Sequence, residues 1–214
     1  MTALEKVVEK QEMPFRSNRK PKEPPRGEAV YELAVKALAN RGRSTAELRT
    51  FLTRRGASED DIGAAIVRLR EHGYLDDTKF AKSFVRSRIE NAGHGAGRVR
   101  RDLAKKRVAR TVADQAVAGG YEQVNERELV RDYLRRKLRL ASPPSKPSAL
   151  ASLYQRLLRA GFSSATIVKE LSGLNSARVR GADGPTIDPE KWREWIESLA
   201  DSTLDAEDSE QTSE

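Results

Sequence analysis

The chain contains an internal repeat, and this repeat constrains the fold more than any other feature of the sequence. A shift of 105 residues brings eight positions of matching chemical type into register without a gap. These positions are Leu48, Leu52, Arg54, Gly56, Ser58, Ile62, Ile66 and Leu69, which fall on Leu153, Leu157, Arg159, Gly161, Ser163, Ile167, Leu171 and Leu174. Self-similarity of this kind predicts one supersecondary unit that is used more than once.

A weaker third copy lies between these two. A shift of 51 residues places Leu48, Leu52, Ile62 and Ile66 on Val99, Leu103, Ala113 and Val117. The glycine at position 56 becomes Arg107 in this copy, while the pair Gly73-Tyr74 recurs as Gly120-Tyr121. We therefore expect three related units.

Each unit is predicted to form three helices, because its aliphatic residues come in pairs four positions apart. Gly56 lies where a left-handed C-cap is needed, and Ser58 can cap the next helix. Ser44 and Glu47 have the spacing of a capping box. The first helices of the three units are predicted over 28–39, 78–88 and 125–138. Because no segment shows sustained period-two alternation, we expect an all-α protein.

Units of this size bury little core on their own, so neighbouring units must stack. We predict an elongated array of three tandem three-helix repeats with disordered N- and C-terminal tails. The expected segments are a basic, proline-rich disordered tail (1–27), three units (28–77, 78–124 and 125–175), a linker with an amphipathic helix (176–200) and an acidic disordered tail (201–214).

Composition excludes several kinds of site. The chain has no cysteine and only two histidines, so we expect no disulfide, no metal site and no cofactor. No apolar run is long enough for a membrane span or a signal peptide, and we expect a cytoplasmic protein without membrane contact.

The net charge is +8, divided into +3 for residues 1–27, +11 for 28–200 and −6 for 201–214. A body this basic indicates a polyanion or an acidic protein surface as partner, unless it is simply a solvated arginine-rich surface.

The sequence resembles the RecX family, bacterial modulators of the RecA recombinase, most specifically over 44–88. The run Gly73-Tyr74-Leu75-Asp76-Asp77 is followed there by Phe80-Ala81 and Phe84-Val85. The basic run GAGRVRRDLAKKRV (95–108) is similar to the family's second unit, and 129–174 matches more loosely. The insert at 142–148 and the extension after Asn175 depart from the family pattern.

The resemblance implies a non-enzymatic regulator that binds the RecA filament, lies along its groove and inhibits ATP hydrolysis, strand exchange and filament growth. It also implies weak, non-specific binding of single- and double-stranded DNA, with roles in recombination, DNA repair and the SOS response. We expect a monomer. The alternative is a helical DNA-binding module that acts as a transcription factor or nucleoid-type binder, although the third helix of the first unit begins with acidic residues. No constellation of catalytic side chains favours an enzyme.

Two basic segments are the candidate binding sites for RecA or DNA, since guanidinium groups pair with both phosphates and carboxylates. In the first, Val99 and Leu103 face the core and leave basic residues on the exposed face. The candidates are Arg98, Arg101, Lys105, Lys106, Arg107 and Arg110 in the first segment, and Arg131, Arg135 and Arg136, beside Arg127, in the second. The alternative for both is a solvated helix face, with Glu128 and Asp132 pairing locally in the second.

The remaining motifs have structural interpretations. Tyr74, Phe80, Phe84 and Tyr133 have core spacing, so no base-stacking site is expected. The glycines of 93–97 are interpreted as a flexible joint with an exposed His94, and Asp76-Asp77 as a helix cap. Over 187–200, Asp188 and Pro189 start a helix whose stripe (Trp192, Trp195, Ile196 and Leu199) docks on the third unit or fits a partner groove.

Overall fold

A computed structural model describes residues 23–138, 144, 146–178, 188 and 190–199. All regular structure in these residues is helical, which confirms the all-α prediction; the predicted acidic tail and most of the basic tail lie outside them. The helices are α1 (Glu28–Asn40), α2 (Thr45–Thr53), α3 (Glu59–Glu71), α4 (Asp77–Ser87), the π-helical turn η1 (Arg88–Ala92), α5 (Ala96–Lys105), α6 (Arg110–Tyr121), α7 (Glu126–Asp132), the π-helical turn η2 (Tyr133–Lys137), α8 (Pro147–Arg159) and α9 (Ser164–Arg178), followed by a helix over 190–199.

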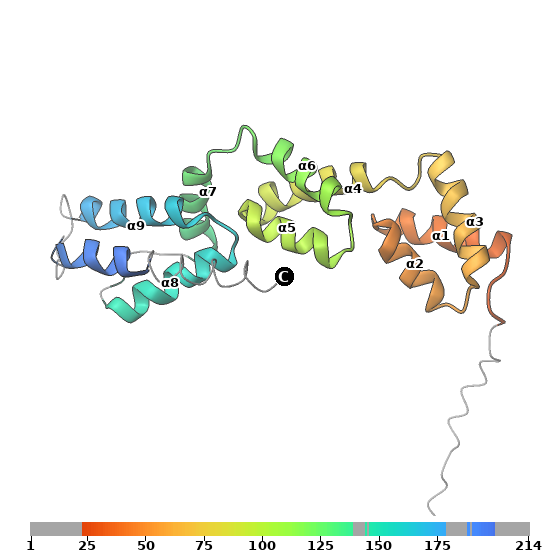
Figure 1. The fold of residues 1–214 in the computed structure, drawn as a ribbon, viewed down its shortest axis with the longest axis horizontal. Coiled ribbons are helices and arrows are strands. Elements are labelled where there is room, and N and C mark those ends of the chain that lie inside the picture. Colours follow the sequence, from red (N-terminus) through yellow and green to blue (C-terminus); the bar gives the residue numbers. More distant parts are fainter. Residues whose placement is uncertain (1–22, 139–143, 145, 179–187, 189, 200–214) are drawn as a thin grey trace, which may run out of the picture.

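These helices form three groups in an elongated row (Figure 1). The first helical group contains α1–α3, the second α4–α6 with η1, and the third α7–α9 with η2 and the 190–199 helix. Each group has its own cluster of buried apolar side chains: Val30 to Leu75 in the first, Ala81 to Val117 in the second and Val130 to Ile196 in the third. The separate small cores account for the low apolar content of the chain, 37%.

The aliphatic positions of the repeat are buried in the described helices. Leu48, Leu52 and Ile62 are fully buried in the first group, and their partners Leu157 and Ile167 are fully buried in the third. The aliphatic positions of the middle copy are buried as well. The spacing therefore identified the core-facing side of the second and third helices in each group.

The predicted caps are present. Ser44 and Glu47 form a reciprocal capping box at the start of α2, and Ser58 accepts a hydrogen bond from the amide of Asp61. Gly56 and Gly161 have φ values of 85° and 91°. Arg107 occupies the same position in the middle copy with φ 54°, so an arginine here adopts the left-handed conformation that favours glycine.

Helix limits differ in places from the prediction. The first helix of the second group continues into η1 and runs as far as Ala92, beyond the predicted end at 88, while that of the third group ends in η2 at Lys137, close to the predicted 138. The predicted turn insert over 142–148 ends earlier than expected. Pro147 is the first residue of α8, because a proline at this position loses no intrahelical hydrogen bond.

Tyr74 was predicted to be in the core, and this is wrong: its side chain is 63% exposed. Gly73 has φ 70° and turns the chain after α3, so that the next inward-facing side chain is Leu75, which is 3% exposed. The ring of Tyr74 instead packs edge-on against His72, with 6.2 Å between centroids. The other three aromatic residues, Phe80, Phe84 and Tyr133, are partly buried against the cores, as expected.

The 190–199 helix docks on the third group, as one of the two predicted alternatives required. Trp192 is 2% exposed, and its indole N–H donates to the carbonyl oxygen of Leu171 at 3.1 Å. Ile196 is buried in the same cluster. Asp188 accepts a hydrogen bond from the amide of Glu190 at 3.0 Å, as a helix cap does, while Pro189 lies outside the described residues.

Candidate nucleic-acid and filament interface

The second helices of the three groups lie end to end along one side of the row, in the order α2, α5, α8 (Figure 1). At the first junction, the hydroxyl of Ser44 donates to the carbonyl oxygen of Lys106 at 2.6 Å. At the second, the amide of Gly95 donates to the carbonyl of Ala160 at 2.9 Å, and that of Gly97 to the carbonyl of Gly161 at 3.0 Å. Each helix start thus satisfies carbonyl groups that the end of the next helix leaves free.

The second junction explains the glycines of 93–97, which were interpreted as a flexible joint. A Cβ on Gly95 would lie 2.2 Å from the carbonyl oxygen of Gly161, and a Cβ on Gly161 would lie 2.1 Å from the amide nitrogen of Arg98. The glycines allow two backbones to touch, so this segment is a packed contact between helical groups.

The expectation of an exposed His94 is also wrong: the ring is half-buried, and its Nδ1 atom has no hydrogen-bond partner among the described residues. Burial, together with the charges of Arg98 and Arg88, lowers the pKa of this imidazole.

Each junction opens into a basic hollow. The hollow where α2 meets α5 has a volume of about 280 Å³, and the one where α5 meets α8 has about 420 Å³. Lys105 lines both. We call their basic residues together the basic junction surface: Arg41, Arg43, Arg54, Arg98, Arg101, Lys105, Lys106, Arg107 and Arg159. The carboxylates that line the hollows are Glu47 in the first and Asp102 in the second.

Five of the nine predicted site residues belong to this surface, and they differ in what they contact. Lys105 and Arg107 are exposed. Arg98 lies 3.9 Å from Asp102, and Arg101 donates to the backbone carbonyl of Arg159 at 3.2 Å. Lys106 is mostly buried between the first two groups, where its ammonium pairs with Glu47 at 2.9 Å and lies over the rings of Phe80 and Phe84. Lys106 therefore holds the first junction together, whereas the exposed Lys105 and Arg107 are available to an anion.

The remaining predicted residues lie elsewhere. Arg110, 96% exposed at its side chain, starts α6 and lies 3.7 Å from Asp114. Arg135 and Arg136 both pair with Asp132, which is the local pairing named as the alternative. Arg131 reaches across to Glu170 of α9, so the second basic segment is largely neutralised within the chain.

Sequence reasoning missed the basic residues that the first and third groups contribute to the surface. Arg54, Lys105 and Arg159 occupy one position of the repeat, at the C-terminal end of α2, α5 and α8, and all three are exposed. The repeat register was the signal that could have identified Arg54 and Arg159 as equivalents of Lys105. A cation at a helix C-terminus also complements the helix dipole, which is the structural explanation for the same pattern.

The electrostatics of the first hollow favour an anion. Burial and the neighbouring charge of Arg41 lower the pKa of the Arg43 guanidinium, as expected where like charges crowd. Burial alone would raise the pKa of Glu47, but hydrogen bonds from Lys106 and from the amide of Ser44 bring it below its ordinary value. Glu47 therefore stays ionised. It pairs closely with Lys106 and lies 3.9 Å from Arg41, so it offsets part of the positive charge, and the remaining arginines keep the hollow basic.

Comparisons with known proteins match the first two helical groups to domains of one family. The family models for the first and second three-helix domains of RecX match residues 31–69 and 76–117. The protein "Regulatory protein RecX" of Mycolicibacterium vanbaalenii is 40% identical over 124 residues, which cover 56% of this chain and 67% of the relative. That of Pseudomonas putida is 34% identical over 68% of this chain and 90% of the relative. The chain belongs to the RecX family.

The fold of the family is also found in solved structures. The crystal structure of RecX from Lactobacillus salivarius aligns with 69% of this chain over 95% of the length of the crystallised chain, with a TM-score of 0.56 and 23% identity.

Within the described residues, no group of three or more histidine, aspartate or glutamate side chains is placed to hold a metal ion. None of the described helices is both long and apolar enough to cross a membrane.

Proposed function

We propose that this RecX-family chain is a non-enzymatic, cytoplasmic regulator that binds the RecA–DNA filament and inhibits ATP hydrolysis, strand exchange and filament growth. The observation that carries the proposal is the basic junction surface in a chain of this family. It runs across both junctions, so its charges are spread along the row instead of gathered in one pocket.

The repeat geometry supports binding to a partner that is itself repetitive. Arg54, Lys105 and Arg159 present one basic position three times along the row. A filament offers equivalent phosphates and protomers at regular intervals, and several weak contacts on one rigid body combine into a strong one. Counterion release from DNA phosphates would add a salt-dependent share of the binding energy.

RecA-catalysed ATP hydrolysis on single-stranded DNA tests the proposal. Addition of the protein in stoichiometric amounts should slow hydrolysis; an unchanged rate at stoichiometric excess would contradict the proposed function.

The binding surface is tested by the double variant Arg101→Glu with Lys105→Glu. It should keep its helicity while its affinity for filament and DNA falls steeply. The matched control, Lys79→Glu with Lys36→Glu, makes the same change of charge at exposed residues outside both hollows and should bind nearly as the wild type does. Equal binding by all three proteins would remove Arg101 and Lys105 from the site.

The alternative of a base-reading module has less support from the structure. At the start of α3, Asp61 accepts hydrogen bonds from the amide of Gly27 at 2.9 Å and from the hydroxyl of Ser58 at 2.7 Å. These acidic residues secure the start of the helix within the first group, and their charge opposes entry into a DNA groove. A strong preference for a selected DNA sequence over random DNA would favour the alternative.

A further inference from the structure

The groove between the first and third helices of a helical group is filled in the first and third groups and open in the second. In the first group, the guanidinium of Arg68 on α3 lies 3.9 Å from the ring centre of Tyr31 on α1. In the third group, Glu170 on α9 is 5% exposed and pairs with Arg127 and Arg131 of α7, each at 2.5 Å. A long side chain of the third helix thus reaches the first helix in both groups.

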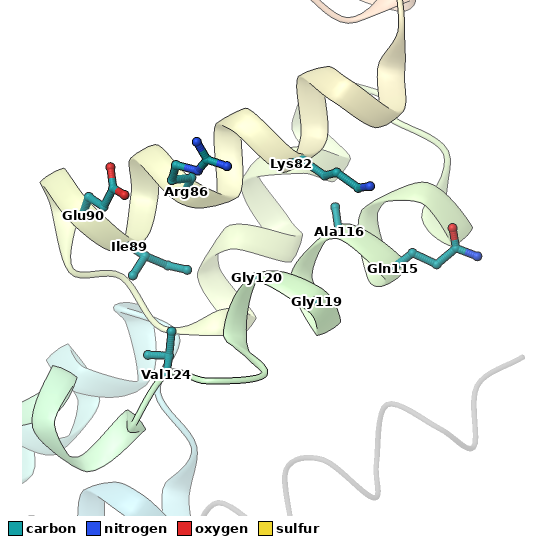
Figure 2. Close-up of a pocket in the computed structure, with 9 residues that line it drawn as sticks. All are labelled: Lys82, Arg86, Ile89, Glu90, Gln115, Ala116, Gly119, Gly120 and Val124. Atoms are coloured by element: carbon teal, nitrogen blue, oxygen red, sulfur yellow. The ribbon is translucent and has the colours of Figure 1, made fainter.

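The second group has small residues at the equivalent positions. In the alignment of the first and second copies, which differ by 51 residues, Gly119 takes the place of Arg68. In the alignment of the second and third copies, which differ by 54 residues, Ala116 takes the place of Glu170. A hollow of about 520 Å³ lies between α4 and α6, compared with about 200 Å³ beside Arg68 in the first group. Figure 2 shows the side chain of Ala116 on α6 turned toward Lys82 of α4. Gly120 packs closer to the first helix, since a Cβ there would lie 2.4 Å from Val85 and 3.9 Å from Ile89.

Among the described residues, the open groove also has no carboxylate at the position equivalent to Glu170. The buried residues of α4 are Ala81 and Val85, and those of the first helix of the third group are Val130 and Leu134. When these two pairs are aligned, Lys82 becomes the counterpart of Arg131. Lys82 therefore faces Ala116 where Arg131 has Glu170. Arg86 follows Lys82 along the rim, and the one carboxylate that lines the hollow, Glu90, lies beyond Arg86 at the far end (Figure 2).

We propose that this groove, lined by α4, η1 and α6, docks a segment of a protein partner that supplies an acidic side chain to Lys82 and Arg86 and an aliphatic side chain to the apolar floor. The floor is made of Ile89, Ala116, Gly119, Gly120 and Val124. This mixture of an apolar floor and a basic rim matches an acidic, aliphatic peptide and differs from the basic junction surface, where charged residues dominate. The inference rests on the proposed function, in which the segment belongs to a RecA protomer.

Filling the groove from within tests the proposal. In Ala116→Glu, the new carboxylate should pair with Lys82 as Glu170 pairs with Arg131. In Gly119→Leu, the new side chain should occupy the floor, since a Cβ at Gly119 meets no atom within 4 Å. The matched control is Gly173→Leu, at the equivalent position of the third group, where a Cβ also meets nothing within 4 Å.

The measurement is the concentration of protein that half-inhibits RecA ATP hydrolysis on single-stranded DNA, together with affinity for the same DNA without RecA. Both groove variants should raise the half-inhibiting concentration about tenfold, the effect of losing one buried anchor, and leave DNA affinity unchanged. Gly173→Leu should match the wild type in both assays.

Three results would overturn the groove as a protein-docking site. If both groove variants have the same half-inhibiting concentration as the wild type, the groove is not used. The proposed function would still stand in that case, because the wild type inhibits RecA ATP hydrolysis. A parallel loss of affinity for free DNA would assign the groove to nucleic acid. If a groove variant loses its helical circular dichroism, the exposed pair Lys82→Glu with Arg86→Glu replaces it, and unchanged inhibition by that pair would equally overturn the proposal.

Discussion

The amide of Gly95 donates a hydrogen bond to the carbonyl oxygen of Ala160, 2.9 Å away, and joins the start of α5 to the end of α8. The contact requires glycine, because a Cβ at this position would lie 2.2 Å from the main-chain oxygen of Gly161. The second and third helical groups therefore meet backbone to backbone at this junction.

The substitution Gly95→Ala should therefore separate these two groups. We expect a loss of about 1–3 kcal/mol in the free energy of unfolding, the usual cost of overpacking, and a larger radius of gyration by small-angle scattering. Gly63→Ala is the control, because a Cβ at Gly63 in α3 meets nothing within 4 Å and alanine favours a helix. Wild-type values for Gly95→Ala in both measurements would show that the junction is not rigid.

Arg107 combines a strained backbone with an exposed charge, and Arg107→Gly separates the two effects. The left-handed φ of 54° should make the glycine variant more stable by about 1 kcal/mol in denaturant unfolding. If Arg107 also neutralises a DNA phosphate, the slope of log affinity against log salt should become shallower by about 1. A variant that is more stable but has an unchanged slope would exclude Arg107 from the DNA contact.

Glu170 should make stability depend on pH. Burial alone would raise the pKa of its carboxyl, but hydrogen bonds from Arg131 and Arg127 lower it below its ordinary value. A carboxyl with a lowered pKa in the folded state stabilises the fold above its unfolded pKa of ~4.3, and this stability is lost as pH falls through the folded value.

The variant Glu170→Gln should accordingly be less stable than the wild type at neutral pH, by about 2 kcal/mol, with the difference shrinking below pH ~4. Chemical unfolding at several pH values measures this. A difference that stays constant down to pH ~3 would indicate that Glu170 contributes by packing and not by its charge.

Tyr74 and Leu75 are neighbours with opposite environments, one 63% and the other 3% exposed. Tyr74→Ser should change the melting temperature little, because the ring is largely exposed and loses only its edge contact with His72, an effect of about 0.5 kcal/mol. Leu75→Ala should cost about 2–5 kcal/mol through the cavity that it leaves. Equal effects of the two substitutions would contradict the way the chain turns after Gly73.

The core was predictable because the repeat encodes it locally. The spacing that pairs Leu48 with Leu52 specifies one helix face, and Gly56 and Ser58 mark where one helix ends and the next begins, so burial and caps follow from a few adjacent residues. Tyr74 failed the same reasoning, since the positive φ of Gly73 breaks the helical register just before it.

The contacts between distant segments could not be predicted in this way. The partners Arg131 and Glu170 are 39 residues apart, and nothing in the spacing of either indicates the other. The position shared by Arg54, Lys105 and Arg159 is an intermediate case, because the repeat register contains the information but only the end-to-end arrangement of α2, α5 and α8 shows its consequence.

Electron cryomicroscopy of the protein bound to a RecA–DNA filament tests the central claim most directly. We expect density for the three helical groups along the filament groove, with α2, α5 and α8 turned toward the DNA and the groove between α4 and α6 against RecA. Binding with the basic junction surface turned to solvent, or an undecorated filament at saturating protein, would contradict it.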